Sequence, residues 1–420
     1  MGESKKSAAI LYIAILLFSC IIGYRDISHT PISGSLIAFL VIGSVIALPY
    51  EKSVWFTFFI MPFTCGIPGY TVLGILIALA FKCKHINLKQ FIIPLVFGLI
   101  EFTHATFYEF DTKYSLILSF ISFVFLFYFL LFDNNDVSHI ECIKMFIYGS
   151  TIVLFIIYLT IIINNSIDEL LLGELRSGKV MGLGEDEDFE IGFLGMNANS
   201  IGLFSITTFS SLMILGRHTL NMNKLLYTIL LSLSIMSGLL SYSRTWILMA
   251  ILVTIIYLFS IKSNRSLGPI FIILAIILIL AYNGTLDQGI EVFTIRFTED
   301  TTAGGRYDLF KFYNEFWLSD VKIFLFGAGT IYNMQVANGL LAIHNSTQQI
   351  YVGYGLVGLI FFIATMISYL KTYKASNLSL IYFVPIIICI IFGQSIQFWY
   401  PSFLIFPYLA TAYILQIKQR

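Results

Sequence analysis

Apolar runs of membrane-spanning length recur along nearly the whole chain, and they limit its fold more than any other feature. A bilayer offers the backbone no hydrogen-bond partner, so a spanning chain forms helices or a closed barrel. A run of roughly 17–25 apolar residues has the length of a transmembrane helix and is too long for a transmembrane strand. The 420 residues are 58% hydrophobic and 11% charged, whereas soluble domains carry roughly a quarter charged residues. The sequence therefore predicts an all-α, polytopic transmembrane helical bundle.

We expect about 12 to 14 transmembrane helices. The pair at 54–66 and 67–81 is short and is interrupted by prolines and glycines, so a re-entrant hairpin is the alternative there. The first run precedes Arg25-Asp26 rather than a small-residue cleavage site, and we interpret it as a retained helix. The expected spans are residues 8–24, 32–49, 54–66, 67–81, 90–103, 115–132, 144–163, 197–215, 224–241, 244–261, 268–283, 346–370, 378–397 and 400–416.

The lysines and arginines of the short loops set the expected orientation. Placing the N-terminus inside puts most of the 24 basic residues on the cytoplasmic side, as the positive-inside rule requires. Both termini are then cytoplasmic. Three regions follow: 1–283 is transmembrane with an outer loop at 164–196, 284–345 is a large extracytoplasmic loop, and 346–420 forms the C-terminal transmembrane helices. No nucleic-acid partner is expected.

The large outer loop contains one segment with helical periodicity. Its apolar residues share one face, and such a face with a tryptophan is typical of a helix on the membrane interface. We therefore expect a short amphipathic helix there, with membrane lipids as partners. The residues of this face are Leu309, Phe312, Tyr313, Phe316 and Trp317.

Arginines on the outer side run against the charge bias, and three of them are candidates for an anion site. Arg244 stands between two apolar runs at the expected outer boundary, where a buried arginine is costly. Arg306 follows Gly304-Gly305 and opens the amphipathic helix, a setting that suits a phosphate or diphosphate. Arg296 is a further candidate of this kind. The alternative is structural: Arg244 snorkels or pairs with an acid, and Arg306 pairs with a neighbouring carboxylate.

His344 ends the large outer loop directly before an apolar run. Asn345 or Ser346 can cap the helix that follows, with Gln348 reaching back as in a capping box. A helix N-terminus disfavours a protonated imidazole, so His344 is a candidate general base, which typically contributes about 10²–10⁴-fold in rate. A structural histidine is the alternative.

Two acidic features complete the candidates. The run Glu185-Asp186-Glu187-Asp188 offers ligands for a divalent cation, but charged loop runs are usually just solvated, so we expect no metal site. Glu101 and His104 share a helix face near the outer boundary, where a polar packing pair is favoured over an acid–base dyad.

The order of these features resembles that of the O-antigen polymerase and ligase superfamily of polytopic glycosyltransferases. His344-Asn345 is followed after nine residues by Gly355 and after two more by Gly358, which is similar to the family's H-N-x9-G-x-x-G signature. Gly305-Arg306, Phe326 to Gly329, Ser243-Arg244 and Asn197-Ala198-Asn199 also resemble family features. The resemblance lies in the second half of the chain; the first 190 residues match only in hydropathy.

The resemblance implies a glycosyltransferase in the cytoplasmic (inner) membrane that acts on undecaprenyl-diphosphate-linked oligosaccharides at the outer face. Arg244 and Arg306 would hold the donor's diphosphate and His344 would deprotonate the acceptor hydroxyl. Arg296, Asn345 and Asn199 are the candidate substrate-binding residues. The arginines would stand in for a metal, so no cofactor is expected.

Three functions remain open from the sequence. A polymerase, favoured here because the composition is similar to that of variable surface-polysaccharide polymerases, moves the growing glycan onto the next lipid-linked repeat unit. A ligase moves the finished glycan to lipid A core or protein. A lipid-oligosaccharide flippase or other transporter predicts repeated halves with charges in the bundle. A polysaccharide chain-length regulator is a candidate partner of the polymerase.

Overall fold

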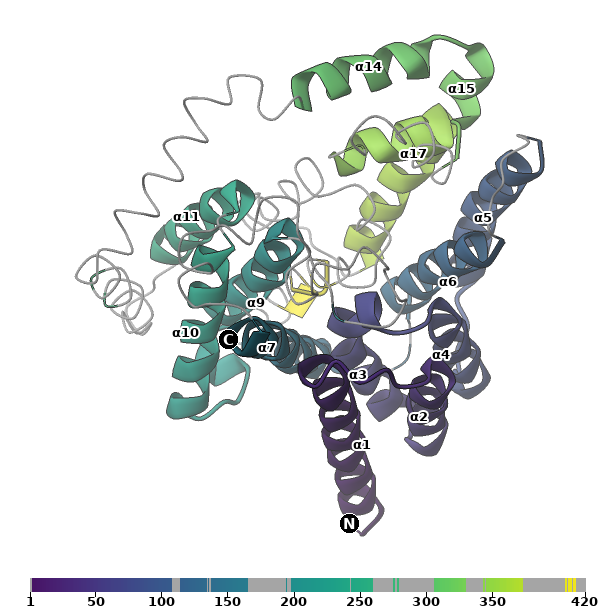
Figure 1. Cartoon of the computed structure of the whole chain (residues 1–420). Coiled ribbons are helices and arrows are strands. Elements are labelled where there is room, and N and C mark those ends of the chain that lie inside the picture. The colour runs from purple at the N-terminus through teal and green to yellow at the C-terminus, as the bar shows by residue number, and fades with distance from the viewer. Residues whose placement is uncertain are drawn as a thin grey trace. The chain divides into compact units, whose positions relative to one another are not determined.

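The protein is all-α in every part that the structure describes, and this confirms the expected fold class. The computed structural model describes fourteen helices, one of them a short 3₁₀ helix (Figure 1). It covers residues 2–107, 114–133, 135, 137–164, 194, 198–241, 243–259, 275, 278, 306–329, 343, 345–372, 405, 407–409, 411 and 412.

Four of the described helices are long and apolar enough to cross a membrane. Their candidate spans are Lys6–Ile27, His139–Ile163, Ser200–Thr219 and Thr347–Tyr369. Helices of this length match the roughly 30 Å hydrocarbon core of a bilayer. Such a set is typical of a multi-pass membrane protein. The expected span at 378–397, and that at 268–283 except for residues 275 and 278, lie outside the described residues.

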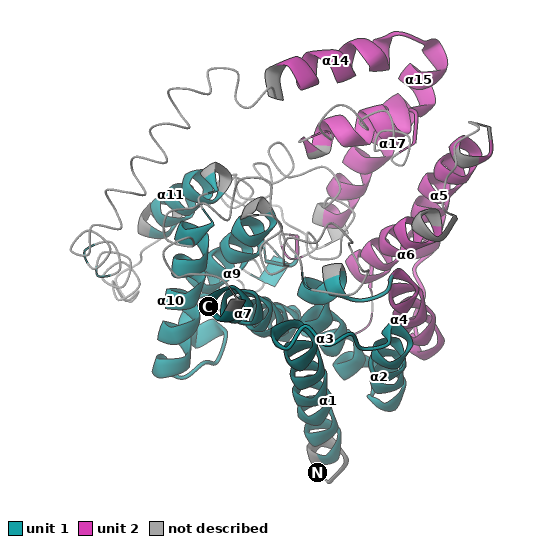
Figure 2. Cartoon of the chain, in the orientation of Figure 1, with its two compact units in different colours: residues 1–68, 137–299, 408–420 teal, residues 69–136, 300–407 magenta. Residues whose placement is uncertain are grey.

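The chain divides into two compact units that are both built from separate stretches of sequence (Figure 2). Unit 1 comprises residues 1–68, 137–299 and 408–420, and unit 2 comprises residues 69–136 and 300–407. The helices of unit 1 are α1 (Gly2–Ile27), α2 (Gly34–Ala47), α3 (Tyr50–Ile60), η1 (Met61–Gly66), α7 (His139–Asn164), α9 (Ala198–Thr219), α10 (Lys224–Leu240) and α11 (Arg244–Phe259).

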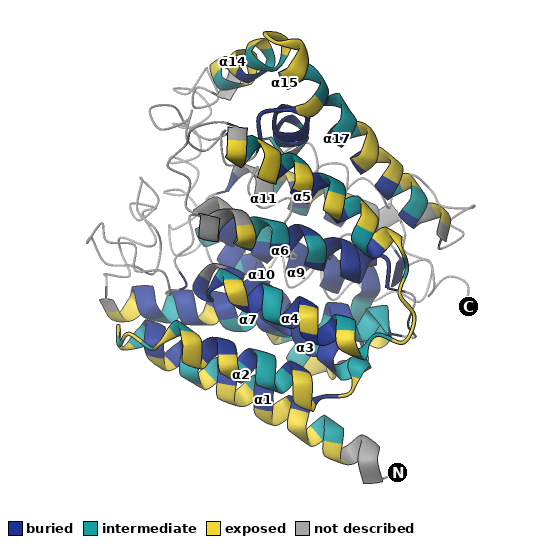
Figure 3. Cartoon of the chain, turned by 90° about the vertical axis from the view of Figure 1, so that its right-hand side faces the viewer, coloured by how far each residue is buried: buried dark blue, intermediate teal, exposed yellow. Residues whose placement is uncertain are grey.

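Helix α7 lies at the centre of unit 1, where it contacts α1, α3, α9 and α10. Helix α1 meets this core along one narrow stripe of buried residues at helical spacing: Leu11, Ala14, Phe18 and Ile22. Large apolar side chains cover its remaining surface and are exposed, as the yellow segments of α1 in Figure 3 show. Exposing such an apolar surface to water is unfavourable, so α1 is suited to contact with lipid.

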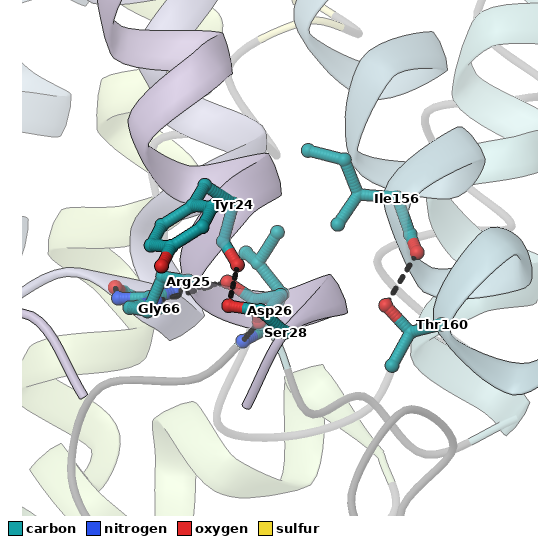
Figure 4. A network of polar contacts seen from close by, with 8 residues as sticks. Tyr24, Arg25, Asp26, Ser28, Gly66, Ile156 and Thr160 are labelled. Carbon is teal, nitrogen blue, oxygen red and sulfur yellow. Dashed lines mark hydrogen bonds and ion pairs between the residues drawn. The ribbon is translucent and has the colours of Figure 1, made fainter. Parts of the chain in front are cut away.

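The end of α1 carries a buried ion pair between Arg25 and Asp26 (Figure 4). Arg25 is 1% exposed and donates to Asp26 Oδ2 through Nε (2.9 Å) and Nη2 (2.7 Å). Its Nη1 donates to the carbonyl oxygen of Gly66 (2.7 Å), and Asp26 Oδ1 accepts from the backbone N–H of Leu194 (2.5 Å). The pair thus ties α1 to the end of η1 and to the chain just before α9.

Unit 2 contains α4 (Gly69–Lys82), α5 (Lys89–Phe107), α6 (Tyr114–Leu131), α14 (Arg306–Leu318), α15 (Val321–Phe326) and α17 (Ser346–Thr372). Helix α6 packs against both α4 and α5, and α17 contacts α5, α14 and α15. One face of α5 carries exposed apolar residues at a spacing of three or four, namely Ile92, Leu95, Leu99 and Phe102. Its opposite face is buried at Phe97 and Glu101.

Helix α17 is not the continuous helix that the sequence predicts over residues 346–370. Gly355 has φ 68° and ψ −167°, which is outside the helical region, and the helix bends there (Figure 1). A first part of nine residues, Ser346–Tyr354, therefore precedes a second part that ends at Thr372. Since a residue with a Cβ rarely adopts such a φ, glycine is required at the bend.

Candidate functional site

The first part of α17 and helix α14 run side by side in the same direction (Figure 1). Contacts along the two helices occur in the same order: Gln348 Nε2 donates to Phe310 O (2.9 Å) and to Asn314 Oδ1 (3.2 Å), and further along, the Trp317 and Tyr351 rings lie 4.6 Å apart. The N-terminal ends of both helices consequently lie together. Two helix N-termini place unpaired N–H groups and positive dipole ends at one place.

Two candidate residues from the sequence occupy these ends. Arg306 is the first residue of α14, as expected. Asn345 caps α17, because its Oδ1 accepts from the backbone N–H of Gln348 (3.0 Å). Phe310, one turn after Arg306, bonds Gln348, three residues after Asn345. The structure therefore brings these two sequence-predicted positions to one end of unit 2.

The capping box expected at the start of α17 is only half right. Asn345 supplies the cap, but the Gln348 side chain does not reach back to it. That amide instead crosses to α14, where it bonds Phe310 and Asn314. The Tyr351 hydroxyl also donates to Asn314 Oδ1. These bonds hold the two helix starts together, and Gln348 is 2% exposed.

The expected amphipathic helix is present as α14, but most of its apolar face packs on protein instead of being left free for the membrane interface. Tyr313 is fully buried against Ile343 and Val352. Leu309, Phe316 and Trp317 pack around the same cluster. Only Phe312 of this face stays substantially exposed (38%). Burial raises the pKa of the Tyr313 hydroxyl, which keeps that group protonated.

His344 itself lies outside the described residues, but both of its sequence neighbours are placed. Ile343 is 3% exposed within the Tyr313 cluster, and Asn345 caps α17. The chain is thus anchored on either side of His344, by Tyr313 of α14 and by the first turn of α17. Arg296 and the acidic run 185–188 also lie outside the described residues. Within the described part of the chain, no group of three metal-ligating side chains occurs.

The residues after α15 lie against the bend of α17. The backbone N–H groups of Ala328 and Gly329 donate to the carbonyl oxygens of Val352 and Gly353, both at 2.8 Å. Carbonyls near the end of the first part of α17 are satisfied in this way. A Cβ on Gly355 would lie 2.3 Å from the Leu325 backbone, and one on Gly327 (φ 77°) would lie 2.3 Å from that of Gly353. Both positions accept glycine alone.

Glu101 and His104 adjoin this joint from α5. The Tyr354 hydroxyl donates to Glu101 Oε1 (2.8 Å), and Glu101 is 3% exposed. His104 Nε2 lies 3.4 Å from the Phe326 carbonyl oxygen. Both side chains therefore make contacts that position neighbouring segments, in agreement with the interpretation of a polar packing pair.

Asn199 and Arg244 belong to unit 1, where they lie in the first residues of α9 and α11. These two helix starts lie together, because a Cβ on Gly202 would lie 2.6 Å from Ser243 Cβ. The Ser243 hydroxyl accepts from the N–H of Trp246 (3.4 Å), a capping contact at the start of α11. The six site residues thus fall into a unit 1 pair, a unit 2 pair, and the undescribed Arg296 and His344.

The roles of Asn314 and Tyr351 were not predicted from the sequence. The signal for Asn314 was a polar residue within the apolar face of α14, next to Phe310 and Trp317 in helical spacing. A partly buried amide of this kind needs hydrogen-bond partners, and Gln348 and Tyr351 supply them.

Comparisons of the chain with models of protein families, with curated proteins and with solved structures find no match.

Proposed function

We propose that the protein is a surface-polysaccharide polymerase of the O-antigen type. It transfers a growing undecaprenyl-diphosphate-linked glycan onto the next lipid-linked repeat unit, at the outer face of the cytoplasmic membrane. Both termini are cytoplasmic in this proposal, and the joint start of α14 and α17 faces the outer side.

The observation that carries the proposal is the convergence of the two helix starts in unit 2. Arg306 opens α14, and Asn345 caps α17 directly after His344. Helix N-termini and a guanidinium both favour a diphosphate. The described helices include spans long and apolar enough to cross a membrane, which suits a substrate whose lipid tail lies in the bilayer. An anion site beside a candidate base is the combination that glycosyl transfer from a lipid diphosphate needs.

The glycine positions of the family-like signature support the proposal further. Nine residues separate Asn345 from Gly355, and these are the nine residues of the first part of α17. Gly355 forms the bend, and a Cβ on Gly358 would lie 2.1 Å from Tyr354 Cβ. The spacing H-N-x9-G-x-x-G therefore has a physical counterpart: a cap, a short helix, and a tight bend.

The proposed reaction is a substitution at the anomeric carbon of the donor. His344 takes the proton of the acceptor hydroxyl as its oxygen attacks. The bond from the anomeric carbon to the diphosphate oxygen breaks with inversion, and the lipid diphosphate leaves with that electron pair. Arg306 stabilises the diphosphate charge. Asn345 contacts the substrate, and no metal cofactor takes part.

Deletion of the gene, followed by gel analysis of the surface polysaccharide, tests the proposal. A polymerase deletion leaves glycan caps of one repeat unit in place of the ladder. Complementation with the wild-type gene restores the ladder. Full-length polymer that stays unattached would identify a ligase instead, and loss of all exported glycan would identify a flippase; either result refutes the proposal.

A further inference from the structure

Two adjacent glutamines in the first turn of α17 differ in their hydrogen bonding. Gln348 and Gln349 are 2% and 3% exposed. Gln348 bonds Phe310 and Asn314 of α14 through its amide nitrogen. The amide oxygen of Gln349 is fully buried, and no donor for it is found among the described residues. A buried acceptor without a donor is costly, so this oxygen calls for an explanation.

The position of Gln349 points to the candidate site. Its backbone N–H donates to the carbonyl oxygen of Asn345 (2.9 Å), so the two residues are one turn apart on the same helix face. Helical side chains lean toward the N-terminus of their helix. The Gln349 amide therefore extends toward the turn that begins with Asn345, next after His344, over a rise of only about 6 Å.

A glycan is a fitting source of the missing donor. Sugar hydroxyls donate hydrogen bonds, and a neutral amide oxygen accepts them without the charge of a carboxylate. Ligand sites carry a small number of precisely placed polar groups that fix the orientation of the ligand.

We propose that Gln349 is a substrate-binding residue whose amide oxygen accepts a hydrogen bond from a hydroxyl of the acceptor glycan. This inference rests on the proposed polymerase function and names a contact of the same site. The Gln348 side chain hydrogen-bonds to α14, and the Gln349 side chain hydrogen-bonds to the glycan. The two neighbours thus provide a matched pair for a test, since they have the same side chain and nearly the same burial.

The test uses the full-length protein in detergent. The parent protein carries His344→Ala, so that the substrate is not consumed. Gln349→Met and Gln348→Met are compared with this parent. The probe is the single-repeat lipid-diphosphate oligosaccharide extracted from the deletion strain. Thermal unfolding is measured without probe and over a probe titration, which yields the intrinsic stability and the affinity separately.

We expect Gln349→Met to unfold at the parent's temperature or higher, since it removes a buried oxygen that has no donor among the described residues. We expect it to bind the probe about 3- to 10-fold more weakly, which is the effect of one lost neutral hydrogen bond. Gln348→Met should unfold at a lower temperature, because it breaks two bonds to α14.

Two results overturn the assignment of Gln349 while leaving the polymerase function standing. One is a Gln349→Met protein destabilised as much as Gln348→Met, which would reveal a donor within the protein or a bound water. The other is unchanged probe affinity in Gln349→Met. If the probe fails to stabilise even the parent, the polymerase proposal fails, and the role of Gln349 falls with it.

Discussion

The bend of α17 makes a sharp prediction about Gly355→Ala. Gly355 has φ 68°, a conformation that costs an L-residue roughly 1–2 kcal/mol. The added Cβ would also lie 2.3 Å from the carbonyl carbon and oxygen of Leu325. These are backbone atoms, so no side chain can rotate away, and relieving such overpacking costs about 1–3 kcal/mol more. We expect Gly355→Ala to lower the free energy of unfolding by about 2–5 kcal/mol in total.

Gly43→Ala is the matched control for this substitution. Gly43 lies inside α2, and a Cβ there would meet nothing within 4 Å. Alanine is favoured over glycine in a helix interior by about 0.5–1 kcal/mol, so this variant should be as stable as the wild type or more stable.

The assay is a titration of purified protein in mixed micelles with SDS, followed by tryptophan fluorescence. Gly355→Ala should unfold at a lower SDS fraction than wild type, and Gly43→Ala should not. A Gly355→Ala protein with wild-type stability would refute the positive φ and the close contact with Leu325. Equal losses in both variants would show that glycine replacement in general, and not the bend, is responsible.

Three further predictions concern charged groups and metal. Asp26→Ala leaves the buried Arg25 without its carboxylate and should lower the free energy of unfolding by about 3–5 kcal/mol. The control Glu141→Ala breaks the more exposed pair with Lys144 and should lower it by less than about 1 kcal/mol. Equal effects of the two variants in SDS unfolding would disprove the buried ion pair of Arg25 and Asp26. Arg306→Lys should lose most polymer at normal protein level, because an ammonium cannot replace the guanidinium fork. The ladder should persist in Lys311→Arg, because Lys311 is exposed on the same helix. A normal ladder in Arg306→Lys would show that Arg306 has no role in binding the diphosphate. Polymerisation of purified lipid-linked substrate should continue in EDTA, and a loss of activity that Mg²⁺ or Mn²⁺ reverses would restore the acidic run as a metal site.

The helices themselves were largely predictable, because length and apolarity alone specify a membrane span. Helix α1 and the start of α17 follow from their apolar runs, and the cap at Asn345 follows from its place directly before one. Arg306 at the start of α14 was predictable for a similar reason: two glycines precede it and a periodic apolar face follows it.

The contacts between helices were not predictable from these local patterns. The apolar face of α14 shows that something apolar covers it, but protein and lipid satisfy that requirement equally well. The bend at Gly355 depends on contact with Leu325, thirty positions earlier in the chain. Gln348 can cap its own helix or cross to another one, and only the position of α14 decides between the two. The pairing of Arg25 with Asp26 and Gly66 is likewise set by tertiary packing.

The central claim is that His344 is the general base of glycosyl transfer beside the joint start of α14 and α17. The most direct measurement is the polysaccharide ladder of the deletion strain complemented with His344→Ala, with His218→Ala, an exposed residue at the end of α9, as the control. At equal membrane levels, we predict single-repeat caps alone for His344→Ala and a full ladder for His218→Ala. A ladder of wild-type length in His344→Ala would contradict the account.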